Sequence, residues 1–127
     1  MKILLDTHAF LWFLGGNSEL SKNARSVIEN IDNDKYISIA SFWEIAIKNS
    51  LGKLFLDVPF AEIKNEAIIN GFQLLPITFE DTLQLIALPF NHSDPFDRII
   101  ISQAKNNNLT LLSRDSAFNL YSINLIW

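Results

Sequence analysis

Cysteine is absent from this chain of 127 residues. Without cysteine there can be neither a disulfide framework nor a thiolate metal site, so oxygen or imidazole must hold any bound metal. Basic residues are also few, with 10 Lys and Arg against 14 Asp and Glu and a net charge of −4. Strong non-specific binding to nucleic acid needs clustered Lys and Arg. An acidic protein of this kind can still act on nucleic acid where metal ions neutralise its site.

Long hydrophobic runs and linker-like segments are missing as well. No stretch approaches the roughly 18 apolar residues of a membrane span, so we expect a soluble, cytoplasmic protein without membrane contact. The apolar run after Lys2 is interrupted by Asp6 and His8, and no small-residue cleavage pattern follows, which argues against a signal peptide. Length, 49% hydrophobic content and the lack of repeats predict one domain spanning residues 1–127.

Short apolar runs alternate with helical patterns along the chain. The runs predict buried strands at residues 2–5, 36–39, 72–77, 110–112 and 123–126. Amphipathic segments with plausible caps predict helices near residues 9–14, 21–31, 41–51, 60–70, 79–88 and 94–107. This alternation predicts an α/β fold, a three-layer sandwich with a central, mainly parallel β-sheet flanked by helices.

Two acids follow predicted strands directly. Asp6 comes directly after the first strand. Asp115 follows the segment that ends at Leu112, with Ser113 and Arg114 between them. Ligands of open parallel sheets bind at the carboxyl ends of the strands. We therefore expect both carboxylates at one edge of the sheet.

Glu44 lies near the start of the helix that follows the second predicted strand, and its role there has two interpretations. With Ser41 it can form a capping box, in which Glu44 bonds back to the helix start. Helical spacing instead places Ser41, Glu44 and Lys48 on one polar stripe, which points Glu44 away from the core towards a cleft or solvent.

Asp97 lies in the first turn of the last long helix, after a predicted N-cap at Asp94 and Pro95 at the first helical position. The helix dipole favours an acid there. Capping does not explain why all four acids fall where strands end or helices begin. Gathered carboxylates repel one another unless a cation lies among them, and all-oxygen ligands favour Mg²⁺ or Mn²⁺. Such a site suits phosphodiester hydrolysis.

At these residues the chain resembles a PIN-domain nuclease, in particular the VapC-like toxin of a bacterial toxin–antitoxin pair. The resemblance covers nearly the whole chain. It is carried by residues 4–8 (LLDTH), 41–48 (SFWEIAIK), 94–98 (DPFDR), 113–115 (SRD) and the terminal Trp127.

The resemblance implies a Mg²⁺- or Mn²⁺-dependent endoribonuclease that hydrolyses RNA, is often a homodimer and is blocked by a cognate antitoxin protein. The acids that match the family's metal-binding and catalytic positions are Asp6, Glu44, Asp97 and Asp115. Thr7, beside the first acid, either binds a metal-bound water or caps the following helix.

Several polar neighbours of these acids have more than one interpretation. Lys48 forms a surface ion pair or contacts phosphate, and Arg98 and Arg114 hold the scissile phosphate or balance local charge, with phosphate binding favoured. His8 and His92 are expected to be structural or solvated, because the ring of His8 need not point in the direction of the Asp6 carboxylate and His92 has no partner at ligand spacing.

Other functions predict different patterns. A haloacid dehalogenase-like phosphatase needs a second Asp two positions after the first, where this chain has His8. A phospho-accepting receiver domain needs paired acids near its start and a Lys after a late strand, and neither pattern is present. A PIN domain that only binds its partner also stays open, since intact acids favour activity without establishing it.

Overall fold

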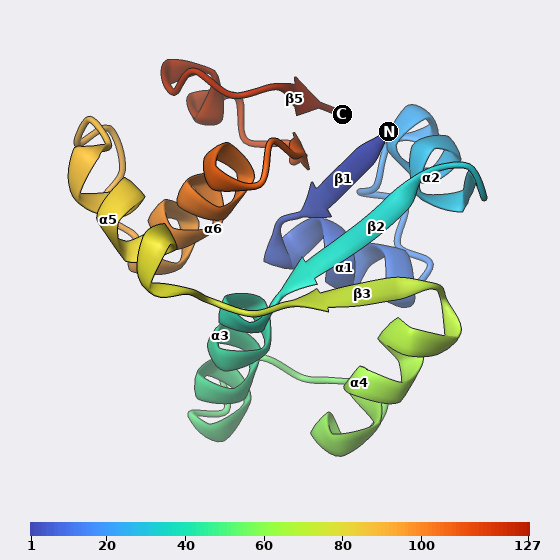
Figure 1. Cartoon of the computed structure of the whole chain (residues 1–127). Coiled ribbons are helices and arrows are strands. Elements are labelled where there is room, and N and C mark those ends of the chain that lie inside the picture. Colours follow the sequence, from blue (N-terminus) through green and yellow to red (C-terminus); the bar gives the residue numbers. More distant parts are fainter.

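The computed structural model describes residues 1–127 and is built on a five-stranded sheet (Figure 1). Its strands are β1 (Lys2–Leu5), β2 (Asp34–Ser38), β3 (Phe72–Leu75), β4 (Thr110–Leu112) and β5 (Leu125–Ile126). Their order is β3-β2-β1-β4-β5, and every neighbouring pair is parallel. The predicted α/β sandwich is confirmed.

Helices cover both faces of this sheet. They are α1 (Thr7–Leu14), α2 (Lys22–Glu29), α3 (Ile39–Ser50), α4 (Phe60–Ile69), α5 (Phe79–Ala87), α6 (Pro95–Asn106) and the short 3₁₀ helix η1 (Ser116–Leu120). Side chains of β1 alternate between two cores, because successive residues of a strand point to opposite faces. Ile3 and Leu5 pack with α1, α2 and α4, whereas Leu4 packs with α6 and η1. None of the helices has the length and apolar character needed to cross a membrane.

Three predicted strands have different bounds in the structure. The second begins earlier, at Asp34, and the fifth covers only Leu125–Ile126 instead of residues 123–126. The second ends at Ser38, since Ile39 already belongs to α3. The third ends at Leu75, because Pro76 has no N–H to continue the ladder. The N-cap of the last long helix, in contrast to these strand ends, was predicted correctly. Asp94 accepts hydrogen bonds from the Phe96 and Asp97 amides, as expected for an N-cap followed by proline.

The strand order reverses direction between β1 and β4. From β1 the chain moves outward through β2 to β3, and it then returns to place β4 on the other side of β1. Such a reversal opens a crevice at the carboxyl ends of the two central strands. Asp6 follows β1 there, and Ser113 and Asp115 follow β4.

Phe10 is the largest side chain of the core beneath this edge, and it is fully buried. Its ring makes edge-to-face contacts with Phe42 and Phe72, at centroid distances of 5.8 and 5.4 Å. We expect Phe10→Ala to lower the free energy of unfolding by about 3–5 kcal/mol, because the cavity cannot fill completely. Phe55→Ala is the matched control, since Phe55 is 91% exposed. Urea unfolding of both variants measures the difference, and equal losses would contradict this packing.

Candidate active site

Asp6 links the first helix to the fourth strand. As the N-cap of α1 it accepts a hydrogen bond from the Ala9 amide through Oδ1, at 2.8 Å. Its Oδ2 accepts the hydroxyl of Ser113, and its own amide donates to Leu112 O at 3.1 Å. Both oxygens of this carboxylate therefore have a partner, and only 9% of the residue is exposed.

Burial is the largest influence on the pKa of Asp6. It raises the pKa of this carboxyl above its ordinary value, because the charged form loses water. The hydrogen bonds from Ser113 and Ala9 and the nearby His8 lower the pKa, whereas the charge of Glu44 raises it. Glu44 thus acts on Asp6 electrostatically.

Glu44 is buried, with 5% of the residue exposed, and its Oε2 lies 2.7 Å from Lys48 Nζ. The capping-box interpretation is wrong. The N-cap of α3 is Ser38, whose hydroxyl accepts from the Ala40 amide, so Ser41 lies inside the helix. Glu44 does not point to solvent as one expectation for the polar stripe had it, because it is buried and its charge acts on Asp6 and Asp97.

Thr7 and Ser41 join α1 to α3. The hydroxyl of Thr7 donates to Ser41 Oγ at 2.9 Å, and both residues are buried. The capping role considered for Thr7 is wrong, because Asp6 caps α1. The bond holds the helix that begins at Asp6 against the helix that carries Glu44.

Asp97 lies in the first turn of α6, and its pKa is raised to about 7. Loss of water on burial is the largest cause, followed by the charge of Asp94. The charges of Glu44, Asp6 and Asp115 raise it further. The four acids predicted from the sequence therefore interact at one place.

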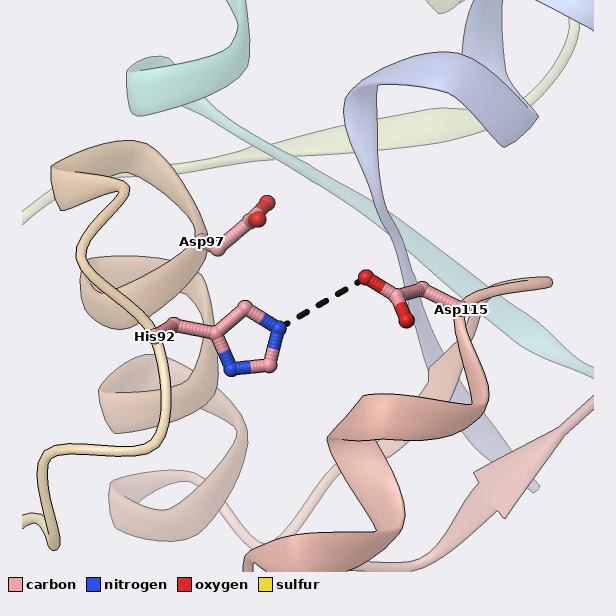
Figure 2. A group of neighbouring side chains, drawn as sticks. All are labelled: His92, Asp97 and Asp115. Atoms are coloured by element: carbon pink, nitrogen blue, oxygen red, sulfur yellow. Dashed lines mark ion pairs between the residues drawn. The ribbon is translucent and has the colours of Figure 1, made fainter.

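Asp115 and His92 complete this side of the cluster (Figure 2). Asp115 caps η1 by accepting from the Ala117 amide, and its Oδ2 lies 3.5 Å from His92 Nε2. One donor atom each from His92, Asp97 and Asp115 lies within 4.8 Å of the others. The structure thus gives His92 the acidic partners that sequence spacing did not reveal, since it arrives from the loop before α6.

An open pocket of about 360 Å³ adjoins the acids, and its lining is Asp6, His8, Trp12, Arg114 and Asp115. The guanidinium of Arg114 stacks over the Trp12 ring, 4.5 Å from its centroid, and pairs with Glu19. About half of the Arg114 side chain is exposed. A basic group at this position can reach an anionic ligand in the pocket.

Arg98 does not have the phosphate-binding role that the sequence favoured. It is buried, and its guanidinium donates to the carbonyls of Pro89 and Leu85. The same group lies 4.3 Å from the centroid of the Phe90 ring. Because successive helical residues point about 100° apart, Arg98 faces away from Asp97 and ties the α5–α6 connection to α6.

The donor set fits a divalent cation. Carboxylates that raise one another's pKa are repulsive when ionised, and a cation among them removes this cost. Carboxylate oxygens are the usual ligands of Mg²⁺ and Mn²⁺. The donor atoms that lie close enough to share an ion belong to His92, Asp97 and Asp115. Asp6 and Glu44 lie outside this group and act on Asp97 through their charges.

Comparison with known families gives one match over most of the chain. Residues 3–123 match the family described as the PIN domain. A comparison with curated proteins finds no match.

Solved structures share this fold at low sequence identity. VapBC2 from Rickettsia felis, bound to a promoter DNA fragment, is 15% identical with a TM-score of 0.72 and covers 99% of this chain and 98% of its own. A toxin–antitoxin complex from Klebsiella pneumoniae is 17% identical, with a TM-score of 0.67 and coverage of 98% and 96%. VapC20 from Mycobacterium tuberculosis, a sarcin-ricin loop cleaving toxin, is 12% identical, with a TM-score of 0.63 and coverage of 93% for both chains. At these identities the similarity shows a common fold.

The raised pKa of Asp97 predicts how stability depends on pH in the absence of metal. Between about pH 4 and 7 the folded chain keeps a proton that the unfolded chain has released, so the free energy of unfolding falls as the pH rises. Asp97→Asn removes the part of this dependence that comes from Asp97. We expect the variant to be more stable than the wild type by about 2 kcal/mol at pH 8 in chelator, and nearly equal to it at pH 4.

Asp32→Asn is the matched control, because it makes the same chemical change at an exposed turn residue. Thermal or urea unfolding at both pH values measures the two differences. A difference for Asp97→Asn that does not change with pH would contradict the raised pKa.

Proposed function

Because the chain belongs to the PIN domain family, we propose that it is a metal-dependent endoribonuclease and the toxin of a toxin–antitoxin pair. The observation that carries the proposal is the meeting of Asp6, Glu44, Asp97 and Asp115 at the sheet edge, where their charges act together on Asp97. Asp6 and Asp115 also line an open pocket that a phosphodiester can enter.

Mg²⁺ or Mn²⁺ is the proposed cofactor, and the four acids are its proposed ligands. When bound, the ion stabilises negative charge on the phosphate and lowers the pKa of a water for in-line attack. Asp97 has to release its proton before it can bind a cation, and its pKa of about 7 puts that step near neutrality. The Ser113 hydroxyl and the Ala9 amide hold the oxygens of Asp6 in place.

Two basic residues complete the proposed mechanism. Lys48 forms a 2.7 Å ion pair with the buried carboxylate of Glu44 and so offsets its charge beside the other acids. Arg114 lies in the pocket wall with half of its side chain exposed, where it can bind the scissile phosphate. A net charge of −4 gives the chain little general attraction for RNA, so this contact and the metal carry phosphate binding.

The proposed partner is an antitoxin protein encoded separately. Support comes from structural neighbours that are themselves toxin–antitoxin complexes. Large apolar side chains lie exposed on this chain, among them Phe55, Ile69, Phe79, Ile86 and Phe90. Exposed apolar side chains can contact another protein chain where they gather into one patch. A homodimer would use the same kind of surface and stays a prediction.

Cleavage of RNA is the decisive test of the proposed activity. Purified wild-type protein is incubated with total RNA in Mn²⁺, Mg²⁺ or chelator, beside Asp97→Asn and the control Asp32→Asn. We expect metal-dependent fragments with the wild type and the control, and a loss of at least about 100-fold with Asp97→Asn, since it removes a proposed metal ligand. The thermal midpoint of the wild type should also rise with Mn²⁺.

Equal cleavage by Asp97→Asn and wild type would contradict the site. If no protein cleaves although Mn²⁺ raises the thermal midpoint, the fold binds metal without acting on bulk RNA. The activity proposed here would then be wrong for general RNA substrates.

Arg114→Ala tests the phosphate contact. We expect KM for RNA to rise about tenfold with a small change in kcat, because a lost charge-assisted bond to phosphate costs about 1.5 kcal/mol. Arg25→Ala is the matched control: Arg25 also lies over an aromatic ring, Phe13, and pairs with Glu29, but it lines no part of the pocket. Steady-state kinetics compare the two, and equal effects would show that only general charge matters.

A further inference from the structure

His92 stands beside the acids, although its place in the sequence indicates no role. The residue lies in the loop before α6, and its side chain is 11% exposed. Figure 2 shows its ring pointing towards the carboxylates of Asp97 and Asp115, with Nε2 on the side of Asp115. Asp97 follows His92 by five residues, whereas Asp115 comes from the segment after β4, so the fold is needed to complete the group.

The ring of His92 is held on several sides. It lies against the ring of Phe118 at a centroid distance of 5.0 Å and against that of Tyr121 at 5.4 Å, and both of these residues are buried. Its Nδ1 lies 3.1 Å from the Tyr121 hydroxyl. These contacts fix the direction in which Nε2 points.

The hydroxyl of Tyr121 suits either form of the imidazole. It can donate to Nδ1 when Nε2 carries the hydrogen, and it can accept from Nδ1–H when Nε2 has a free lone pair. A histidine that binds a metal has its other nitrogen held by such a partner. Tyr121 therefore supplies the support that a ligating imidazole requires.

The distances at Nε2 also favour a shared ion over a direct bond. The 3.5 Å separation from Asp115 Oδ2 exceeds the usual length of an N–H···O hydrogen bond, which is about 2.7–3.2 Å. Donor atoms bound to one ion at about 2.1 Å lie about 3–4 Å apart. The three donor atoms lie within 4.8 Å of one another, so side-chain shifts of about 1 Å are enough for them to share an ion.

We propose that His92 Nε2 is a ligand of the divalent cation together with Asp97 and Asp115, and that this nitrogen makes the site prefer Mn²⁺ to Mg²⁺. Imidazole suits transition ions, whereas Mg²⁺ selects oxygen ligands. The inference rests on the metal site of the proposed function and adds a ligand and a selectivity to it.

His8 is the natural control, because the chain has two histidines and both lie near the acids. His8 lines the pocket and acts electrostatically on Asp6. Its side chain is exposed and stacks on Trp12 at 5.7 Å, and it is not part of the group formed by His92. The two residues therefore give opposite expectations in the same measurement.

Pulsed electron paramagnetic resonance of bound Mn²⁺ tests the assignment on the full chain without an affinity tag. We expect nitrogen hyperfine coupling in the wild type and in His8→Gln, and its loss in His92→Gln. Glutamine keeps an oxygen donor of similar reach, so we also expect the ratio of Mn²⁺ to Mg²⁺ affinity to fall about tenfold in His92→Gln. Equilibrium titration of each metal measures that ratio, and thermal unfolding in chelator verifies that each variant folds.

The outcomes separate this inference from the proposed function. Mn²⁺ binding without nitrogen coupling, or coupling that survives in His92→Gln, would overturn the role of His92 and leave the acidic metal site intact. Coupling lost only in His8→Gln would move the nitrogen ligand to the other side of the pocket. A wild type that binds no Mn²⁺ would overturn both the inference and the metal dependence from which it starts.

Discussion

The carboxylate of Asp6 is the group on which this architecture depends. One oxygen caps α1, and the other accepts the hydroxyl of Ser113 at the end of β4. A buried carboxylate is unfavourable unless its oxygens are bonded, so the start of the first helix and the end of the fourth strand have to meet at this point. The Thr7–Ser41 bond then brings α3 and Glu44 to the same edge. The bonds that hold this edge together thus involve the same part of the chain as the acids proposed to bind the metal.

Periodicity and local capping rules predicted much of the fold. Apolar runs of three to six residues bounded by polar or turn residues indicate strands buried on both faces, and strands that alternate with helices have few arrangements other than a parallel sheet. The same rules placed Asp6 and Asp115 at one edge, because parallel strands end together. Asp94 was identified as an N-cap because its bonds are to amides two and three residues away.

Side-chain directions could not be predicted where two local interpretations had similar energies. Ser38 and Ser41 are both good N-caps, and the apolar Ile39 between them reads equally well as the end of the strand, so the helix start was placed too late. Arg98 follows a proposed metal ligand, yet it turns to the carbonyls of Pro89 and Leu85. Those carbonyls are available only because α5 packs on α6, and His92 likewise gains Asp115 from packing between distant segments.

The bond between Asp6 and Ser113 spans 107 residues, nearly the whole length of the chain. While the chain emerges from the ribosome, the first strand and helix are present long before the strand that completes their edge. A chain that stops before β4 therefore has Asp6, Glu44 and Asp97 but lacks Asp115 and the Ser113 hydroxyl that bonds to Asp6. Long-range contacts of this kind form late in folding. The acidic cluster is therefore complete only when synthesis of the chain is nearly finished, and another protein can already be present by then.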